Sequence, residues 1–338
     1  MPETYPVAVV NLDGTAYSRE MQEYISNIRS EFGPWFNVKT VESYEDAHAM
    51  LQNYDILGII IIPTGFGDNI SKGQVGTLQL EVQNVNWDYP KNYIQRLDEA
   101  VLTFNEDHHI NTDSLSGFEI KVQKSYLIGN DGSDVSGFRG LVVGVVGLYG
   151  IIFGLLMGAL NIAKEYDDKT ILEIINSPVS KSAYLASKQL IGFVFGTVIT
   201  GIIGTILFLV TGVRFQGGFW GVLLIIVSFI LSTWTHATIG ALMGWRFKKI
   251  MPAIIVSIVL SMLFWFFCGG MGPAKMLGEL IFGISRWLPG TYWNEILFSV
   301  TYFPSVHYLA PRFGMLVLFA VICTIVSWTI ISKRGFAL

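Results

Sequence analysis

Five apolar segments in the latter part of the chain constrain its fold most strongly. Each is close in length to the roughly 20 helical residues that cross a hydrocarbon layer about 30 Å thick. Only 14% of the 338 residues are charged, whereas soluble domains carry about 25%. We therefore predict an α-helical polytopic membrane protein with spans at residues 140–163, 190–213, 219–243, 251–271 and 313–331.

Residues 1–138 show the pattern of an α/β domain. Short runs rich in β-branched residues predict strands at 6–12, 36–41, 56–62, 77–85 and 119–128. Amphipathic segments predict helices at 17–32, 43–53 and 92–108. Strands that alternate with helices indicate a partly parallel sheet. We expect an α/β domain over residues 1–138 and a membrane domain over 139–338.

The sequence gives little support for nucleotide binding, nucleic-acid binding or a disulfide. Gly65, Gly67 and Gly73 favour turns over a ligand loop, because no dinucleotide-binding or P-loop motif follows a strand here. Cys268 and Cys323 lie in apolar segments and are expected to pack there rather than form a disulfide or metal pair. A net charge of −4 gives no support to nucleic-acid binding.

His108 and His109, which follow Glu106 and Asp107, raise the question of a metal site. Adjacent residues of a helix point about 100° apart, and no further ligand type clusters nearby, so a solvated helix end is the preferred interpretation. We also find no serine–histidine–aspartate or paired-carboxylate pattern. The sequence thus predicts no catalytic, cofactor-binding or metal-binding residue.

Residues 165–188 form the only long polar interruption among the first spans. Residues 167–176 predict one short amphipathic helix, which Ser177 and Pro178 end because proline disfavours a helical residue before it. Ser180 is placed to cap the helix that continues into the next span. The apolar face of the short helix would comprise Ile171, Ile174 and Ile175.

The same stretch carries a recognisable pattern of polar residues, followed by a lysine that leads into a span. Its positions are Glu165, Thr170, Glu173, Ser177, Pro178, Val179, Ser180 and Lys188. In this pattern the chain resembles ABC-2-type permeases, the membrane subunits of type V ABC exporters. The family usually has glycine before the threonine, whereas this chain has Lys169.

Two segments of the α/β domain also resemble the extracytoplasmic domain of these permeases. They are PVAVVNLDG near the start and IIIIPTGFGDNISKG further on. In the family this domain lies between the first and second spans. The resemblance therefore leads us to expect a further apolar segment of about 20 residues upstream of residue 1.

The resemblance implies how such a chain would work. It implies a separate cytosolic ABC ATPase that holds ATP and Mg²⁺, a second permease copy or a paralogue as dimer partner, and no cofactor on this chain. Glu165 and Thr170 would make polar contacts to the ATPase, and the isoleucines would seat the short helix. The expected coupling residues are Glu165, Thr170, Ile171, Glu173, Ile174, Ser177, Pro178 and Lys188.

Basic residues near the span ends predict the orientation. One side holds nine: Lys164, Lys169, Lys181, Lys188, Arg246, Lys248, Lys249, Lys333 and Arg334. The other side holds five: Arg139, Arg214, Lys275, Arg286 and Arg312. The bias places residues 164–188 and the C-terminus in the cytoplasm and residues 1–138 outside a plasma membrane.

Polar residues in the third predicted span form a stripe at helical spacing. Ser228, Ser232 and Thr235 share it, with His236 alongside, and such a stripe should face the bundle interior. A hydrogen-bonded structural histidine is the preferred interpretation of His236, and a proton relay or substrate ligand is the alternative. Ser232, Thr235 and His236 are therefore candidate pore residues.

Residues 272–312 form neither a short loop nor a domain. They predict short helices at 276–287 and 292–300, broken at 288–290. The aromatic residues Trp287, Tyr292, Trp293, Tyr302 and Tyr308 are typical of an interfacial belt. The resemblance places this segment near the exit side, with Glu279, Arg286 and Glu295 as candidate gate residues.

Small residues recur along the first span. Gly140, Gly144, Gly150, Gly154 and Gly158 allow close helix approach. They are compatible with packing inside one subunit and with a dimer or pore seam.

An exporter permease for an amphiphilic, lipid-like or drug-like substrate is the preferred function. The alternative is a membrane-anchored surface receptor or binding protein that acts through residues 1–138. An intramembrane enzyme is disfavoured, because the spans carry no paired catalytic residues.

Overall fold

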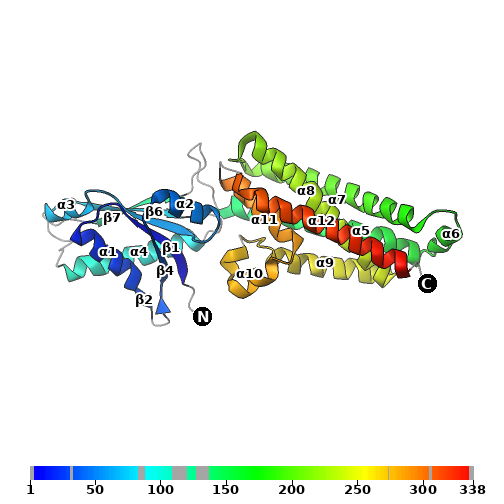
Figure 1. Ribbon diagram of the computed structural model, residues 1–338, viewed down its shortest axis with the longest axis horizontal. Helices are drawn as coiled ribbons and strands as arrows, with labels where there is room; N and C mark the ends of the chain where they lie inside the picture. The colour runs from blue at the N-terminus through cyan, green and yellow to red at the C-terminus, as the bar shows by residue number, and fades with distance from the viewer. Residues whose placement is uncertain are drawn as a thin grey trace. The chain divides into compact units, whose positions relative to one another are not determined.

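A computed structural model describes residues 4–30, 33–82, 88–108, 120–126, 137–272, 274–303 and 307–334. The chain divides into two compact units, Met1–Phe138 and Arg139–Leu338. Figure 1 shows the sheet of the first unit and the long helices of the second.

The N-terminal unit is built on a five-stranded sheet in the order β4-β1-β5-β6-β7. Strand β1 pairs in parallel with β4 and β5, β6 runs antiparallel to β5, and β7 runs parallel to β6. This confirms the predicted α/β unit with a partly parallel sheet. The strands are Tyr5–Asn11 (β1), Phe36–Val41 (β4), Gly58–Ile62 (β5), Gly76–Val82 (β6) and Ile120–Tyr126 (β7).

The central strand β5 is buried along its whole length, and β1 beside it is buried from Val7 to Val10, because both faces of the sheet are covered here. On one face, Ala8, Val10, Ile59 and Ile61 pack against Leu51 and the rest of α2 (Tyr44–Gln52). On the other face lie α4 (Asp88–Asp107) and α1 (Ala16–Asn27), which contact each other (Figure 1).

Local capping sets where the helices of this unit begin. Thr15 accepts a hydrogen bond from the Ser18 amide at the start of α1, and Ser43 accepts one from the Asp46 amide at the start of α2. Helix α1 ends at Asn27, earlier than predicted, because the chain turns into the short strands β2 (Arg29–Ser30) and β3 (Gly33–Pro34). A short helix that the sequence did not predict, α3 (Phe66–Ser71), follows β5.

The glycines after β5 serve backbone geometry, as the turn interpretation predicts. Gly65 adopts a φ of +85°, which side-chain-bearing residues avoid. The Asp13 carboxylate accepts hydrogen bonds from the amides of Gly65 (2.7 Å) and Gly67 (3.1 Å) and from the Thr15 hydroxyl. A Cβ on Gly67 would lie 2.1 Å from Thr15 Oγ1. Asp13 thus ties the loop after β1 to the loop after β5.

The second unit contains five helices that are long and apolar enough to cross a membrane. The predicted spans are confirmed, and each lies within or mostly within one of these helices. They are α5 (Gly137–Asp167), α7 (Lys181–Thr211), α8 (Gly218–Phe247), α9 (Ile250–Phe267) and α12 (Ala310–Arg334).

Helix α5 is the central helix of this bundle. Its apolar window is 56% buried, compared with 17% for α7 and α9. A Cβ on Gly158 would lie 2.2 Å from the Ala237 carbonyl oxygen of α8, and one on Gly240 would lie 2.1 Å from the Leu155 carbonyl oxygen of α5. Gly144 and Gly154 likewise approach Gly270 and His236 of the same chain. In the described residues, these glycines therefore serve packing inside one subunit.

Gly158→Ala should destabilise the bundle, because its methyl group would meet backbone rather than a movable side chain. We expect a loss of about 1–3 kcal/mol of stability, seen as a lower melting temperature of the full chain in detergent. Gly201→Ala on α7 is the matched control, since its Cβ would enter open space and alanine favours a helix. Equal melting temperatures for both variants would contradict the central role of α5.

Asp13→Ala should loosen the loop after β5 from the loop after β1 in a pH-dependent way, because Asp13 accepts hydrogen bonds from the Gly65 and Gly67 amides. Burial opposes ionisation of Asp13, but the hydrogen bonds from Thr15, Gly67 and Gly65 outweigh it and hold the pKa below 3.8. A carboxyl whose folded pKa is depressed stabilises the fold above its unfolded pKa and loses this contribution as the pH falls through the folded pKa.

Amide hydrogen exchange of residues 64–67, normalised to intrinsic rates, measures this effect. At pH 6 we expect about fivefold faster exchange in Asp13→Ala. This factor corresponds to the loss of about 1 kcal/mol, the contribution of one partly screened hydrogen bond to a charged group. The difference should shrink as the pH falls below 3.8. Asp68→Ala, which removes an exposed carboxylate of α3, is the control. A pH-independent difference would contradict the role of the charge.

Candidate functional site

The polar interruption folds into a compact turn between α5 and α7, which we call the elbow (residues 164–188). Helix α5 continues through Asp167, and α6 (Ile171–Ile175) is shorter than the predicted helix over 167–176. The break falls at Lys169, whose φ of +63° is left-handed. A glycine adopts this conformation without strain, which gives a physical reason for the glycine of the resembling family. Figure 1 shows α6 beyond the ends of α5 and α7.

The elbow is seated on the bundle mainly through Ile171. This side chain is fully buried in a cluster with residues from four spanning helices, and Ile174 packs against that cluster. Ile175 is 45% exposed, so its predicted place on the seated face is wrong. The cluster consists of Ile162, Tyr166, Ile171, Tyr184, Leu185, Ala241 and Ile331.

A polar group beside this cluster ties α5 to α7. The Glu165 carboxylate accepts a hydrogen bond from the Tyr184 hydroxyl and forms an ion pair with Lys188. The side chains of Glu165 and Lys188 are only 15% and 19% exposed. The structure therefore brings Glu165 and Lys188 together as partners within the chain, a pairing that the sequence analysis did not foresee.

The remaining predicted elbow residues shape the backbone. The Thr170 hydroxyl donates to the Glu165 carbonyl oxygen (3.4 Å), and the Ser177 hydroxyl donates to that of Ile174 (2.8 Å). Ser180 accepts from the Ala183 amide at 3.2 Å, which confirms it as the N-cap of α7. Pro178 lies in the exposed turn between these two serines.

Part of the elbow is not covered by the bundle. Leu172, Ile175 and Val179 are 39%, 45% and 52% exposed, and Glu173 is exposed as well. We call these four residues the elbow face. Such an apolar patch with an acidic residue can pack against another polypeptide.

The polar stripe of α8 lies inside the bundle, as the sequence predicts. Ser228, Ser232, Thr235 and His236 are fully buried. The Nδ1 atom of His236 lies 2.8 Å from the Ser232 carbonyl oxygen and 3.3 Å from the Ser232 hydroxyl, and Thr235 donates to the Leu231 carbonyl oxygen. His236 Nε2 has no hydrogen-bond partner among the described residues. The bond to Ser232 agrees with the preferred structural interpretation of His236, and its roles as a proton relay or substrate ligand stay predictions.

The candidate gate residues have different surroundings. Glu295 is 8% exposed, and its carboxylate accepts a hydrogen bond from Arg312 Nε at 2.9 Å. Arg286 is exposed, with its guanidinium 5.5 Å from the centre of the Phe282 ring. The side chain of Glu279 lies outside the described part. Sequence reasoning missed the pairing of Arg312, although an arginine at the start of an apolar span signals a buried partner.

The segment that carries these residues folds differently from the prediction. After η1 (Ala274–Leu277) and α10 (Glu279–Ser285), α11 (Pro289–Tyr302) begins at its proline, which is tolerated in the first helical turn. The predicted break between two short helices is confirmed, but it lies at residues 286–288 rather than 288–290, and the second helix starts at 289 rather than 292. A further turn, η2 (His307–Leu309), precedes α12.

The predicted aromatic belt is wrong for Trp293 and Tyr302. These side chains are 1% and 7% exposed, because α11 packs against α8 and α12. Trp287 is 79% exposed, which suits an interfacial position. The side chain of Tyr308 lies outside the described part.

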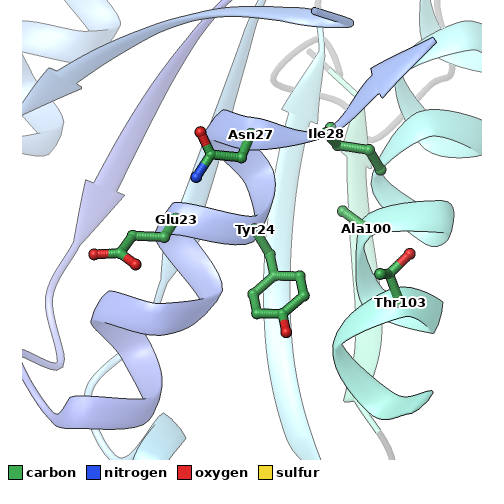
Figure 2. Close-up of a pocket in the computed structure, with 6 residues that line it drawn as sticks. All are labelled: Glu23, Tyr24, Asn27, Ile28, Ala100 and Thr103. Atoms are coloured by element: carbon green, nitrogen blue, oxygen red, sulfur yellow. The ribbon is translucent and has the colours of Figure 1, made fainter. Parts of the chain in front are cut away.

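The N-terminal unit has a groove of about 300 Å³ between α1 and α4, which the sequence did not predict (Figure 2). At its edge the Tyr24 hydroxyl donates to the Asp107 carboxylate at 2.5 Å, and this bond raises the pKa of Tyr24 to about 12. The lining residues are Glu23, Tyr24, Asn27, Ile28, Ala100 and Thr103.

The histidine at the end of α4 is engaged by its neighbours. The His108 ring stacks on Phe104, and its Nε2 lies 3.3 Å from Glu20. His109 lies outside the described residues. Among the described residues, no group of three or more histidine, cysteine, aspartate or glutamate side chains is placed to hold a metal ion.

Comparison with known proteins gives a family match over nearly the whole chain. The model of a family described as "ABC-2 family transporter protein" matches residues 1–329. A solved domain from Thermotoga maritima MSB8, described as belonging to an ABC type-2 transporter, is 13% identical and aligns over 36% of this chain and 86% of its own. Its TM-score of 0.29 is too low to establish a shared fold. No curated protein matches the chain.

Lys188→Met should destabilise the elbow, because it leaves the largely buried Glu165 carboxylate without its cation. We expect a loss of about 2 kcal/mol, measured as a lower melting temperature of the full chain. The double variant Glu165→Gln/Lys188→Met should recover most of it, since no unpaired charge remains. Lys181→Met, at an exposed position of the same helix, should change little. A double variant no more stable than Lys188→Met would contradict the pairing.

Proposed function

The chain belongs to the family of ABC-2 transporter proteins, and from this premise we propose that it is the membrane permease of an ATP-driven exporter. It is a multi-pass membrane protein and a transport component. In our proposal a separate cytosolic ABC ATPase supplies the energy, and a second permease copy or paralogue completes the transporter. The chain contains no P-loop sequence, so ATP and Mg²⁺ would be held by the ATPase.

The observation that carries this proposal is the seating of the elbow. Ile171 anchors it in a cluster of residues from α5, α7, α8 and α12, and the Glu165–Lys188 ion pair ties α5 to α7. A displacement of the elbow would therefore be passed to four membrane-spanning helices at once. Close-packed interfaces transmit strain rather than absorb it, as a coupling element requires.

The elbow face supports a protein partner at this point. Three of its four residues are apolar and exposed. The lysine distribution places this end of the bundle on the cytoplasmic side, where these side chains would meet water rather than lipid. Exposed apolar side chains in water favour burial against another chain. We assign this face to the ATPase, with Glu173 as its polar contact.

The orientation completes the proposal. The elbow and the C-terminus would lie in the cytoplasm of a cell with this protein in its plasma membrane, and residues 1–138 would lie outside. An apolar bundle with few charged residues suits an amphiphilic, lipid-like or drug-like substrate better than an ion or a sugar.

Ile175→Asp should weaken ATPase binding without unfolding the permease, because the side chain is 45% exposed. We expect at least a tenfold loss of the ABC ATPase that copurifies with the chain, and a matching loss of transport after reconstitution. A buried apolar contact of this kind is worth about 1.5–3 kcal/mol. Glu173→Lys should also uncouple ATP hydrolysis from transport, and it avoids the internal pairing of Glu165.

Leu12→Asp is the matched control, since Leu12 is 46% exposed but lies in the N-terminal unit. It should leave ATPase binding intact. Normal copurification and transport for Ile175→Asp would overturn the proposed coupling. A surface receptor that acts through residues 1–138 would instead be insensitive to both elbow variants.

A further inference from the structure

Two polar contacts join α1 to α4 at one end of the groove in the N-terminal unit. The Glu20 carboxylate lies 3.3 Å from His108 Nε2, and the Tyr24 hydroxyl donates to the Asp107 carboxylate. Beside them the rings of Tyr24 and Phe104 meet edge to face, with their centroids 5.3 Å apart. We call the contact between Glu20 and His108 the clasp.

The clasp lies next to the residues that line the groove. Tyr24 and Thr103 are lining residues on the two facing helices (Figure 2). Glu20 precedes Tyr24 by about one turn of α1, and His108 follows Thr103 by little more than one turn at the end of α4. A change at the clasp therefore affects how closely the two helices approach at this end of the groove.

Both ring nitrogens of His108 lie beside oxygen atoms that accept hydrogen bonds. Nδ1 is 3.1 Å from the Phe104 carbonyl oxygen, and Nε2 is 3.3 Å from the Glu20 carboxylate. A carbonyl oxygen and an ionised carboxylate have no proton to donate. A neutral imidazole carries a single N–H, so it satisfies only one of these two acceptors and turns a lone pair toward the other.

The clasp therefore holds one proton more than a neutral imidazole and an ionised carboxylate hold together. Imidazoles change charge between about pH 5 and 8, whereas carboxyl groups do so at lower pH, so this proton belongs on the ring. His108 directly follows the last residue of α4, and the C-terminus of a helix also favours a cation. The geometry thus describes a charged pair of an imidazolium and a carboxylate.

The surroundings of the ring are compatible with its positive charge. The His108 ring stacks on Phe104 and lies 6.1 Å from the Tyr17 ring, measured between centroids. Its side chain is 22% exposed, so protons reach it from water. Among the described residues of the two helices, the titratable groups around it are Tyr17, Glu20, Tyr24, Glu106 and Asp107. None of these groups is a cation that would repel a protonated ring.

We propose that Glu20 and His108 form a proton-binding site that clasps α1 to α4 at acidic pH and releases them as the pH rises. A contact that needs an extra proton in the folded state stabilises it at low pH and is lost as the pH rises through the range in which histidine ionises. The bond between Tyr24 and Asp107 needs no such proton and remains. The pH of the medium around the N-terminal unit thereby regulates the width of the groove.

Solid-state NMR of the full chain in lipid, with nitrogen-15 in the histidine rings, tests the state of the clasp. The His108 signals are assigned by their absence from the His108→Gln variant. At about pH 5 both ring nitrogens should be protonated, and at about pH 8.5 Nδ1 alone should keep its proton. A neutral ring at the lower pH, or a proton on Nε2 rather than Nδ1 at the higher pH, would overturn the proposal.

Amide hydrogen exchange of residues 21–27 of α1, normalised to intrinsic rates, tests whether the clasp holds the helices together. In the wild-type chain, exchange should be about two- to fivefold faster at about pH 8.5 than at about pH 5, the effect of one partly exposed ion pair. His108→Gln cannot change charge, so its exchange should not depend on pH. Glu20→Gln should also remove the pH dependence, because an amide bonds the ring in either state.

Two further variants separate the clasp from its surroundings. Asp107→Asn weakens the bond to Tyr24, so it should speed exchange at both pH values and keep their ratio. Glu99→Gln removes an exposed carboxylate of the same helix and should behave like the wild-type chain. A pH dependence that survives Glu20→Gln, or one that disappears in Asp107→Asn, would assign the proton to another pair and overturn the proposal. Equal wild-type exchange at both pH values would do the same.

These measurements are independent of the proposed exporter function. They use the permease chain alone, so their failure would remove the clasp and leave the coupling of the elbow to an ATPase untouched. Conversely, a wild-type chain that transports nothing would still bind a proton between Glu20 and His108. If residues 1–138 lie outside the cell, as proposed above, the site responds to the external pH.

Discussion

The close approach of α5 to its neighbours is the contact on which the membrane unit depends. Lipid tails are as apolar as leucine, so helices in a bilayer gain little from burying apolar surface and associate through packing at small residues. Gly158 of α5 meets the backbone of Ala237, and Gly240 and Gly244 of α8 meet the backbone of Leu155 and Ala159. With glycine on both helices, α5 and α8 can pack backbone to backbone.

This packing fixes the position of the elbow. Helix α5 runs without a break from the packed region to Asp167. The packing of α5 therefore also fixes where Glu165 and Tyr166 lie. Tyr184 and Lys188 of α7 then meet Glu165, and Ile171 closes the cluster. The ion pair and the apolar cluster act together, because the carboxylate and the ammonium lose hydration only where the seated elbow shields them.

How far the sequence predicts this structure depends on the range of the interaction. The caps at Ser43 and Ser180 and the elbow's break near Pro178 follow from residues within one turn of each other, and they were predictable. Ile175 and Trp293 were misplaced, because periodicity shows that a helix has an apolar side but not which neighbour covers it. The Glu295–Arg312 pair joins residues 17 positions apart on two helices, and only their packing brings them together.

The sequence alone determined the five spans, the strands of the N-terminal unit and the polar elbow, because apolar length, β-branched runs and proline act locally. The tertiary structure alone decided three further features. It showed that the glycines of α5 pack inside the chain, that Glu165 faces Lys188, and that Glu20 of α1 meets His108 at the end of α4. Each depends on contacts between helices that are distant in sequence, and such contacts are set by how whole helices pack rather than by any local pattern.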